Sequence, residues 1–262
     1  MPLNSKNTKV SDNILVLCSN RIKSLLSKVK IKQYQQLQFK KFRQKYGLFV
    51  VEGLKSVNEL IQSKWPIESI VCSTSFEGKI ESIDSIDLFL VKPKEFETIS
   101  QQKTPQGILA IAQFHQLNLE ETPWQIALDN INNPGNLGTI IRIADWYGIN
   151  TIYCSQDTVD LYNSKVIQSS MGSFLRVQLK YGNLTETLNQ KEVYATMLDG
   201  KNIRTLPNIK SGVLLIGNEA NGISESLTES LTHTPITIPG NIQTESLNAA
   251  MATAICCERL MG

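Results

Sequence analysis

Three segments in the second half of the chain place glycine, asparagine and a charged residue where a strand is expected to give way to a helix. They read NPGNLGTIIR (residues 133–142), IGNEANGIS (216–224) and IPGNIQTESLNAA (238–250). At such junctions free backbone NH groups can hold a ligand, and a nearby side chain can act on it. Three junctions of the same kind predict one composite site.

Composition limits the class of protein to which such a site can belong. The 262 residues are 41% hydrophobic and 19% charged, which is enough to bury a core and to form two domains. No apolar run approaches the roughly 20 residues that span a bilayer. The first residues, MPLNSKNTKV, lack the apolar core of a signal peptide. We therefore expect a cytoplasmic protein without a membrane segment.

Histidine and cysteine usage excludes several classes of enzyme. The two histidines, His115 and His233, flank apolar strand-like runs and lie outside the glycine-rich segments. A Ser-His-Asp or Cys-His catalytic set and an HExxH zinc site are therefore not expected. The five cysteines form no CxxC pair, so we expect them to be reduced and structural, with no metal centre.

Positive charge is concentrated near the start of the chain. Residues 21–45 contain nine lysines and arginines and no acidic residue, although the net charge of the whole chain is only +2. Four aromatic residues are interleaved with these charges: Tyr34, Phe39, Phe42 and Tyr46. Lysines neutralise phosphates and aromatic rings stack on unpaired bases, which favours contact with a nucleic acid. The alternative is a solvated basic helix packed by its own aromatic residues.

Hydrophobic periodicity indicates a small α/β unit in the first part of the chain. Strands are expected at residues 48–51, 67–72, 88–91 and 108–113, with a helix at 54–62. A polar stretch at 116–124 then ends the pattern. We predict a polar extension at residues 1–20, a first domain at 21–116, a linker at 117–124 and a second domain at 125–262.

The second domain alternates strands and helices. Strands are expected at residues 125–128, 151–154, 193–197, 213–216 and 236–238, with helices from about 136 to 147 and from about 246 to 260. In the first of these helices, Leu137, Ile140, Ile141 and Ala144 form the buried stripe, and Arg142 lies beside it. This alternation predicts a mainly parallel sheet covered on both faces, which binds ligands beyond the carboxyl ends of its strands.

The three segments lie where those strands end, but they are not the usual nucleotide loops. Neither unit has a GxGxxG sequence after its first strand, and the chain has no GxxxxGKS/T sequence. Dinucleotide-binding and phosphate-loop interpretations therefore lack their specific signals. The junctions serve another ligand.

Three motifs in these segments resemble those of the SpoU/TrmH family of RNA ribose methyltransferases. They are N-x5-R at Asn136 and Arg142, GNExxGIS at residues 217–224, and IP followed by ESLN at 245–248. The intervening SKVIQSSMGSFLRV at 164–177 is similar to the family as well. In the first domain, KKFRQKYGLFVVEG at 40–53 and TPQGILAI at 104–111 resemble its RNA-recognition module. The resemblance covers nearly everything after about residue 20.

This resemblance implies a fold, a cofactor and a reaction. The fold would be α/β: a parallel-sheet domain with a deep trefoil knot, an exception to the rule against knots, preceded by a small α/β domain of the L30e-like type. A homodimer would transfer a methyl group from S-adenosylmethionine to a ribose 2′-OH of rRNA or tRNA. The residues expected to contact the cofactor, mainly through their backbone, are Thr196, Leu198, Gly217, Asn218, Glu219, Ile238 and Leu247.

By the same resemblance, two residues of the first motif would act on the ribose. A ribose hydroxyl is a weak nucleophile that must lose its proton while it lies in line with the methyl group. Arg142 would orient a phosphate and polarise this hydroxyl; the alternative is an ion pair with Asp145, three residues further on. Asn136 would fix Arg142 or the ribose, and asparagine also suits a helix N-cap.

The other two motifs would complete the catalytic site. Glu219 would anchor Arg142 or the RNA, the alternative being a carboxylate solvated in a turn. Asn248 would organise the pocket and Ser246 would contact RNA or cofactor; otherwise both are polar residues in the first turn of the last helix. In the first domain, RNA contacts are expected from Lys40, Lys41 and Arg43.

Two further functions remain open from the sequence. The first is an RNA-binding assembly factor on the same scaffold that has lost transfer, although a pure binder has no need of the polar set in the three motifs. The second is methylation of a base nitrogen. Nuclease digestion separates this activity from ribose methylation, because a 2′-O-methyl group blocks cleavage that requires a free 2′-OH.

Overall fold

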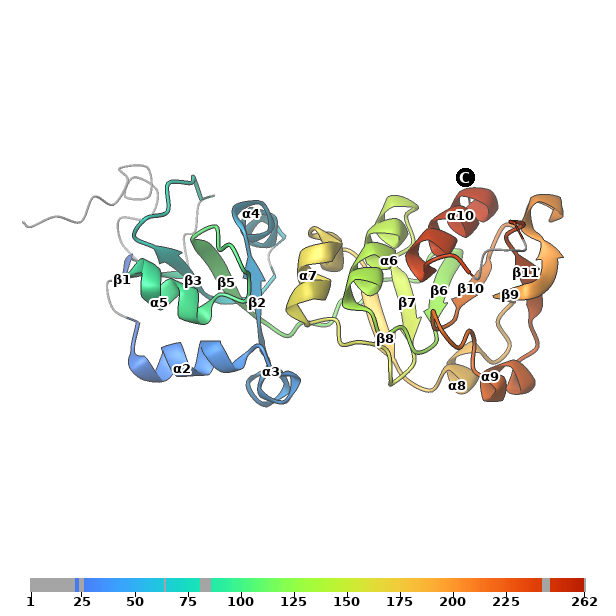
Figure 1. Ribbon diagram of the computed structural model, residues 1–262, viewed down its shortest axis with the longest axis horizontal. Helices are drawn as coiled ribbons and strands as arrows, with labels where there is room; N and C mark the ends of the chain where they lie inside the picture. The colour runs from blue at the N-terminus through green and yellow to red at the C-terminus, as the bar shows by residue number, and fades with distance from the viewer. Residues whose placement is uncertain (1–21, 24–25, 64, 81–85, 242–245, 262) are drawn as a thin grey trace, which may run out of the picture. The chain divides into compact units, whose positions relative to one another are not determined.

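The chain forms two compact units, residues 1–115 and 116–262. A computed structural model describes residues 22–23, 26–63, 65–80, 86–241 and 246–261 (Figure 1). The expected polar extension at residues 1–20 lies outside the described residues. Each unit has its own sheet and its own cluster of buried apolar side chains.

The first unit is a mixed five-stranded sheet with strand order β1-β4-β3-β5-β2. β1 and β3 run parallel to β4, whereas β5 is antiparallel to β2 and β3. Its strands are β1 (Ile22–Lys23), β2 (Leu48–Glu52), β3 (Ile67–Ser73), β4 (Asp87–Val91) and β5 (Ile108–Gln113). Its helices are α2 (Lys28–Gln36), α3 (Lys40–Tyr46), α4 (Leu54–Gln62) and α5 (Pro93–Ile99). The strands and the helix expected here from periodicity are present to within one residue at each end.

The basic stretch folds into two helices, α2 and α3, whereas the alternative to nucleic-acid contact was a single solvated basic helix. α2 ends because Leu37 turns fully into the core and Phe39 takes an extended conformation that a helix cannot continue. Tyr34 of α2 is also fully buried, and its hydroxyl lies 2.9 Å from both Glu68 Oε1 and Ser69 Oγ. Gly47, in the left-handed conformation, ends α3.

The second unit is a six-stranded sheet in which every pair of neighbouring strands is parallel, with order β11-β9-β10-β6-β7-β8. Its strands are β6 (Trp124–Leu128), β7 (Thr151–Cys154), β8 (Gln178–Tyr181), β9 (Val193–Asn202), β10 (Gly212–Ile216) and β11 (Thr234–Thr237). Its α-helices are α6 (Pro134–Trp146), α7 (Ser164–Ser170), α8 (Leu184–Leu188), α9 (Glu225–Ser230) and α10 (Ala249–Met261). α6 and α10 cover one face of the sheet, and α8 and α9 cover the other (Figure 1). The expected parallel sheet is confirmed.

Two helix starts differ from the sequence prediction. α6 begins at Pro134, and its N-cap is Asn133, whose Oδ1 accepts from the backbone NH groups of Gly135 and Asn136 at 2.8 and 3.3 Å. The expectation that Asn136 caps this helix is therefore wrong. α10 begins only at Ala249, because Asn248 Oδ1 accepts from the NH groups of Ala250 and Met251, 2.9 and 3.3 Å away.

β9 is longer than the expected strand and is interrupted. Its pairing with β11 shifts register: Pro235 pairs with Ala195, but the next residue, Ile236, pairs with Lys201. Residues 196–200 therefore form a loop that does not pair with β11. At the end of this loop Gly200 lies so close to β11 that a Cβ atom would be 2.5 Å from the carbonyl carbon of Ile236, so a side chain cannot be placed there.

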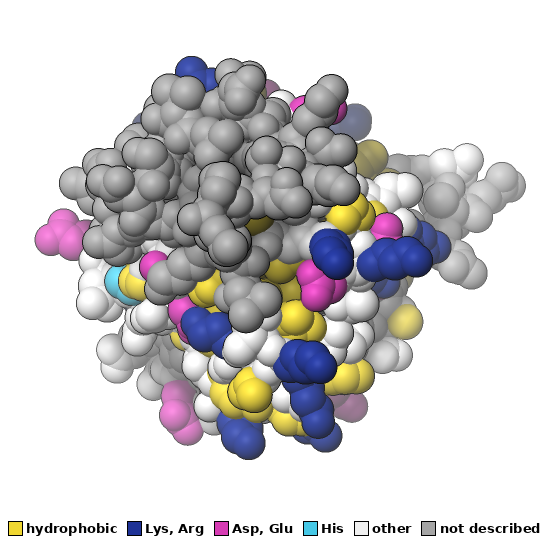
Figure 2. All heavy atoms as spheres, turned by 90° about the vertical axis from the view of Figure 1, so that its left-hand side faces the viewer, with side chains coloured by type: hydrophobic (Ala, Val, Ile, Leu, Met, Phe, Trp, Pro, Cys, Tyr) yellow, Lys and Arg dark blue, Asp and Glu magenta, His cyan; other side chains and the backbone are white. Residues whose placement is uncertain are grey.

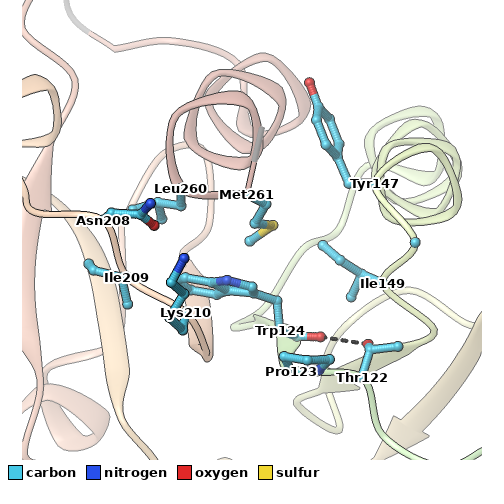
Figure 3. Close-up of a pocket in the computed structure, with 11 residues that line it drawn as sticks. Thr122, Pro123, Trp124, Tyr147, Ile149, Asn208, Ile209, Lys210, Leu260 and Met261 are labelled. Carbon is cyan, nitrogen blue, oxygen red and sulfur yellow. Dashed lines mark hydrogen bonds between the residues drawn. The ribbon is translucent and has the colours of Figure 1, made fainter.

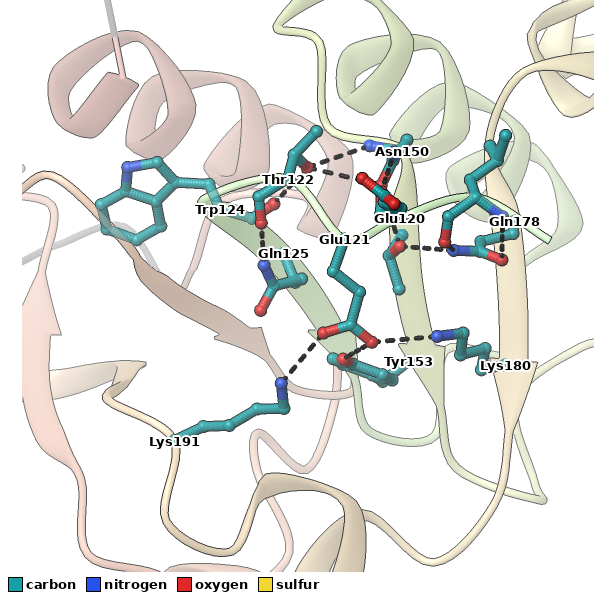
Figure 4. A network of polar contacts seen from close by, with 12 residues as sticks. Glu120, Glu121, Thr122, Trp124, Gln125, Asn150, Tyr153, Gln178, Lys180 and Lys191 are labelled. Atoms are coloured by element: carbon teal, nitrogen blue, oxygen red, sulfur yellow. Dashed lines mark hydrogen bonds and ion pairs between the residues drawn. The ribbon is translucent and has the colours of Figure 1, made fainter.

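The linker before β6 is fixed to the sheet by polar contacts (Figure 4). The Glu121 carboxylate accepts hydrogen bonds from the Tyr153 hydroxyl at 2.6 Å, from Lys180 Nζ at 2.9 Å and from Lys191 Nζ at 3.1 Å. Asn150 Nδ2 donates to the carbonyl of Glu120 at 2.6 Å. The hydrogen bonds from Tyr153 and Lys180 lower the pKa of Glu121 to about 2.

Other features of the described residues bear on the classes of site that are possible. No helix among them is long and apolar enough to cross a membrane, and this part of the chain has no group of three His, Cys, Asp or Glu side chains suited to a metal ion. The four described cysteines are buried and free. Burial raises the pKa of the Cys256 and Cys257 thiols to about 12, so these thiols stay protonated.

Replacing Glu121 by Gln should reduce stability in a pH-dependent way. The pKa of Glu121 is lowered from 4.5 to about 2 on folding, so its ion pairs stabilise the native state fully above pH 4.5 and lose this effect as the pH falls to about 2. Urea unfolding at pH 7 and near pH 2.5 should show a larger difference between wild type and Glu121→Gln at pH 7. Glu120→Gln, which changes the exposed neighbouring carboxylate, should differ little from wild type at either pH. An equal deficit for Glu121→Gln at both pH values would contradict this interpretation.

Candidate active site

The junctions after β6 and β10 lie side by side at one edge of the parallel sheet. β6 and β10 are paired in register, with Leu128 opposite Ile216, so their following loops start at the same level. Asp129 Oδ2 accepts from the backbone NH of Ser224 at 2.7 Å, and Asn218 Nδ2 donates to the carbonyl of Asn130 at 2.8 Å. The two loops are therefore held together by two hydrogen bonds, both donated by the loop after β10 to the loop after β6.

Asn136 joins all three motifs. Its Nδ2 donates to Glu219 Oε1, and its Oδ1 accepts from Asn248 Nδ2 at 2.8 Å. The Asn136 side chain is buried, whereas Glu219 is half-buried. A carboxylate, an amide and a second amide thus form a chain of hydrogen bonds across loops that follow different strands. The structure brings together three of the five residues expected to be catalytic.

The loop after β10 is shaped by two glycines and one asparagine. A Cβ atom on Gly217 would lie 2.3 Å from the carbonyl carbon of Gly222, so the two arms of the loop touch through their backbones. Asn218 and Gly222 exchange backbone hydrogen bonds of 2.9 Å, and Asn218 Oδ1 accepts from the NH of Ala220 at 2.9 Å. This tight turn presents the Glu219 side chain to Asn136.

Arg142 does not join this chain of hydrogen bonds. It is exposed on α6 and makes no hydrogen bond or ion pair with any described residue. Six residues of α-helix rotate a side chain by about 240°, so Arg142 and Asn136 project from different sides of α6. The expected alternative, an ion pair of Arg142 with Asp145, is also not formed, because Asp145 binds Arg176 through two donors at 3.0 and 2.6 Å. Among the described residues the guanidinium of Arg142 has no partner and is exposed to solvent.

The residues expected to contact a cofactor lie on loops at this same edge. Thr196 and Leu198 belong to the looped-out segment of β9, and Thr196 Oγ1 donates to the carbonyl of Leu215 at 3.1 Å. Ile238 follows β11, and Leu247 directly precedes the N-cap of α10. Leu198 is 77% exposed and Leu247 48% exposed, which leaves apolar surface on two of the loops. Ser246 is exposed beside Leu247, whereas residues 242–245 lie outside the described residues.

A cavity of about 370 Å³ lies at the opposite edge of the sheet (Figure 3). It is lined by the start of β6 at Trp124, by Ile149 ahead of β7 and by Lys210 ahead of β10, with Leu260 and Met261 of α10 above them. Thr122 Oγ1 donates to the carbonyl of Trp124 at its margin, at 2.8 Å. None of the motif residues lines this cavity, so it is separate from the composite site.

Comparison with known proteins agrees with this geometry. Residues 123–258 match the SpoU rRNA Methylase family. The chain belongs to this family. Residues 28–110 match the MRM3-like substrate binding domain. The expected SpoU/TrmH membership and the expected class of enzyme, an RNA methyltransferase, are thereby confirmed.

Several members of the SpoU family are similar to the chain over most of its length. The 23S rRNA (guanosine(2553)-2′-O)-methyltransferase RlmP of Bacillus subtilis is 29% identical over 239 residues, covering 89% of this chain and 96% of that protein. A TrmH-family structure from Porphyromonas gingivalis superposes with a TM-score of 0.80 at 31% identity, covering 90% of this chain and 98% of that one. An AdoMet-bound rRNA methyltransferase from Sinorhizobium meliloti gives a TM-score of 0.76 at 28% identity, with 91% and 97% covered.

The substrate-binding unit of this SpoU-family chain requires one correction to the expected RNA contacts. Lys40 and Lys41 are exposed at the start of α3. Arg43 is only 3% exposed, and its NH1 group donates to the carbonyls of Leu37 and Gln38 at 3.0 and 2.9 Å. It joins the end of α2 to α3 and has no free surface for a phosphate. Figure 2 shows Lys and Arg side chains among hydrophobic ones on the described part of this end of the molecule.

Sequence reasoning missed two residues that shape the SpoU-family site. Asp129, the first residue after β6, holds the loop that carries Glu219 through its bond to Ser224, and its position at the end of a predicted strand was a usable signal. Arg176 keeps Asp145 away from Arg142. Nothing in the sequence pattern identifies that pairing, because the two residues lie 31 positions apart.

Asn136→Asp tests the hydrogen-bond chain. The substitution keeps the shape of the side chain but replaces the Nδ2 donor by an acceptor that faces Glu219 Oε1. We expect a loss of about 1–3 kcal/mol in unfolding free energy at pH 7, which becomes smaller on acidification because a protonated carboxyl restores a donor. Chemical denaturation at pH 7 and pH 5 measures both effects. The control is Asn189→Asp, at an exposed asparagine, which should change stability by less than about 0.5 kcal/mol. Equal stability of the two variants at pH 7 would contradict the role given to Asn136.

Proposed function

We propose that this protein transfers the methyl group of S-adenosylmethionine to a ribose 2′-OH of rRNA. The observation that carries the proposal is the hydrogen-bond chain from Asn248 through Asn136 to Glu219, which joins the three motif loops at one edge of the sheet. The names of two relatives support it: one is a 23S rRNA 2′-O-methyltransferase, and the other is an rRNA methyltransferase with AdoMet bound. tRNA is the second candidate substrate.

The loops of this edge fit such a cofactor. S-adenosylmethionine supplies an electrophilic methyl group on a sulfonium. The apolar side chains of Leu198 and Leu247 are exposed on loops at this edge, where the loop after β10 folds so tightly that the backbones of Gly217 and Gly222 touch. A ligand with an apolar adenine ring and polar edges matches a site made of backbone groups and leucine side chains. We assign Thr196, Leu198, Gly217, Asn218, Glu219, Ile238 and Leu247 to its binding.

The residues of the hydrogen-bond chain and Arg142 divide the work of transfer. Asn136, Glu219 and Asn248 hold the loops in one arrangement, so that the reacting groups are aligned before reaction. Arg142 presents a guanidinium that pairs with none of the described residues, and it orients a phosphate and polarises the attacking 2′-hydroxyl. Ser246, exposed beside Leu247, contacts the RNA or the cofactor. In such a transfer the O–C bond would form as the C–S bond of the sulfonium breaks, which would leave S-adenosylhomocysteine, and the proton of the 2′-hydroxyl would pass to water.

The finer description of the fold belongs to the same proposal. We infer a deep trefoil knot in the parallel-sheet unit and an L30e-like arrangement in the first unit, which serves as the RNA-binding domain. The likeness to TrmH and AdoMet-bound rRNA methyltransferase structures supports the first inference. The match of residues 28–110 to a substrate-binding domain and the exposed Lys40 and Lys41 support RNA binding by the first unit. A cytoplasmic location stays a prediction from the sequence.

Arg142→Ala should abolish methyl transfer and leave cofactor binding nearly unchanged. The test is transfer of a labelled methyl group from S-adenosylmethionine to unmodified rRNA, followed by mapping of alkali-resistant linkages, with calorimetry for the cofactor. Loss of the guanidinium removes polarisation of the hydroxyl, so we expect a rate at least about 100-fold lower. Arg204→Ala, which removes an exposed arginine from another part of the unit, should transfer at the wild-type rate. Turnover by Arg142→Ala would remove this residue from the mechanism.

The product map also tests the other two functions. Label at one ribose supports the proposed reaction, and label in a base supports methylation of a ring nitrogen. RNA binding without any label, in free RNA and in ribosomal precursors, would support the assembly factor that has lost transfer.

We also propose that the enzyme is a homodimer formed through α6 and α10. These helices pack against each other, and the Tyr147 hydroxyl of one donates to Glu258 of the other at 2.7 Å. Both expose apolar side chains: Trp146 is 84% exposed, Met251 63% and Ile255 41%. Trp146 lies one turn after Arg142, so a second copy seated here would cover the surface next to the reacting arginine.

Trp146→Asp should convert the dimer to a monomer. A charge placed in an apolar interface must be desolvated on association, which costs several kcal/mol. Sedimentation or light scattering of both proteins measures the mass. Val29→Asp, at an apolar residue of α2 that is 78% exposed, should leave the mass unchanged. A wild-type protein that is monomeric at micromolar concentration would refute the dimer.

A further inference from the structure

Three aromatic rings form a row along one side of α3. Phe39, Phe42 and Tyr46 follow each other at the spacing that places side chains on one helix face. The ring centroids of Phe39 and Phe42 are 6.4 Å apart with the planes inclined by 60°, and those of Phe42 and Tyr46 are 6.2 Å apart with the planes at 14°. We call these three residues the aromatic row.

The aromatic row extends from the core to the surface. Tyr46 packs against the buried cluster of the first unit, and its hydroxyl donates to Gln36 Oε1 at 3.2 Å. Phe42 is half-buried, and Phe39 is 53% exposed. Phe39 makes no side-chain capping contact with α3. Packing within the folded unit therefore covers Tyr46, at the inner end of the aromatic row, and leaves Phe39 more than half exposed.

Lysines surround the aromatic row. Lys41 Nζ lies 4.9 Å from the centroid of the Phe42 ring, and Lys45 Nζ lies 5.5 Å from that of Tyr46. Lys40 and Lys41 occupy the first turn of α3, which contains no acidic residue. Cations there oppose the helix dipole, so helix stability does not explain their presence. The local charge is complementary to phosphate.

The structure excludes two other residues of the basic stretch as RNA contacts. Tyr34 is fully buried with its hydroxyl bonded to Glu68 and Ser69. Arg43 is buried with its guanidinium bonded to backbone carbonyls. Among the four aromatic residues of the basic stretch, Phe39 thus presents the most ring surface, and Lys40 and Lys41 are the cations next to it in the chain.

We propose that Phe39 is a stacking platform for an unpaired base of the RNA substrate, with Lys40 and Lys41 on the flanking phosphates. Phe42, which itself stacks on Tyr46, contacts the ring of Phe39 edge to face and restricts its freedom before binding. A base can stack on this ring only when it is out of a duplex. The substrate region read by the first unit is therefore single-stranded. This inference rests on the proposed function, since it assumes that the first unit binds the RNA to be methylated.

The test compares the affinity of the full-length protein for a single-stranded oligouridylate and for an RNA duplex, by fluorescence anisotropy at several salt concentrations. Phe39→Ala should weaken binding of the single strand by roughly 10-fold, as expected for loss of one stacked base, and leave the salt dependence unchanged. Phe39→Trp should restore binding and Phe39→Leu should not. Lys40→Gln with Lys41→Gln should reduce the slope against salt by about two phosphate contacts.

Val29→Ala is the matched control. It removes an apolar side chain that is 78% exposed on the neighbouring helix, and it should bind the single strand like wild type. Thermal unfolding checks that Phe39→Ala is folded. Because Phe39 is exposed, we expect this variant to fold like wild type. If Phe39→Ala or Phe39→Leu binds the single strand as tightly as wild type, or if the loss is equal for the duplex, the stacking platform is refuted.

Methyl transfer measured in parallel separates this inference from the proposed function. If the wild-type protein methylates rRNA and Phe39→Ala binds the single strand with wild-type affinity, the stacking platform is refuted and the proposed function is retained. Selective loss of single-strand affinity in Phe39→Ala supports the platform. Absence of transfer by the wild-type protein counts against the function, and the binding comparison then reports on the platform alone.

Discussion

The amide of Asn136 is the group on which the arrangement of the candidate site depends. An asparagine side chain offers an acceptor and two donors in one plane, and this one accepts from Asn248 and donates to Glu219. Those partners lie 112 and 83 positions away along the chain. The parallel sheet brings the loops to one edge, and the amide fixes their mutual positions. The side chain is buried. A replacement that cannot both donate and accept a hydrogen bond therefore leaves a polar group of Glu219 or Asn248 unpaired.

The same region keeps one cation out of this network. Arg142 lies on another side of α6, and the two carboxylates expected to bind it have other partners: Glu219 accepts from Asn136, and Asp145 binds Arg176. A guanidinium without a protein partner among the described residues is solvated in the free enzyme and remains available to an anionic substrate. Within α6, Asn136 is therefore engaged in the hydrogen-bond chain, whereas Arg142, on another side of the helix, is exposed to solvent.

The sequence carries enough information for the parallel sheet and for the convergence of the three motifs, because strand periodicity and parallel topology together place loop residues at one edge. It does not determine contacts made by individual side chains. Asn133 and Asn136 are both plausible N-caps, and only Pro134 at the first helical position indicates the former. The burial of Arg43 depends on where α2 ends, and the interruption of β9 depends on its pairing with β11. Such details come from tertiary packing.

The distance along the chain between Asn136 and Asn248 has a consequence for the time at which the site forms. During synthesis at about 5–20 residues per second, the 112 residues that follow Asn136, up to and including Asn248, take roughly 6 to 22 s to be added. Throughout this period the side-chain oxygen of Asn136 has no Asn248 amide from which to accept a hydrogen bond. The nascent chain therefore has a complete hydrogen-bond chain only after almost all of the second unit has been synthesised.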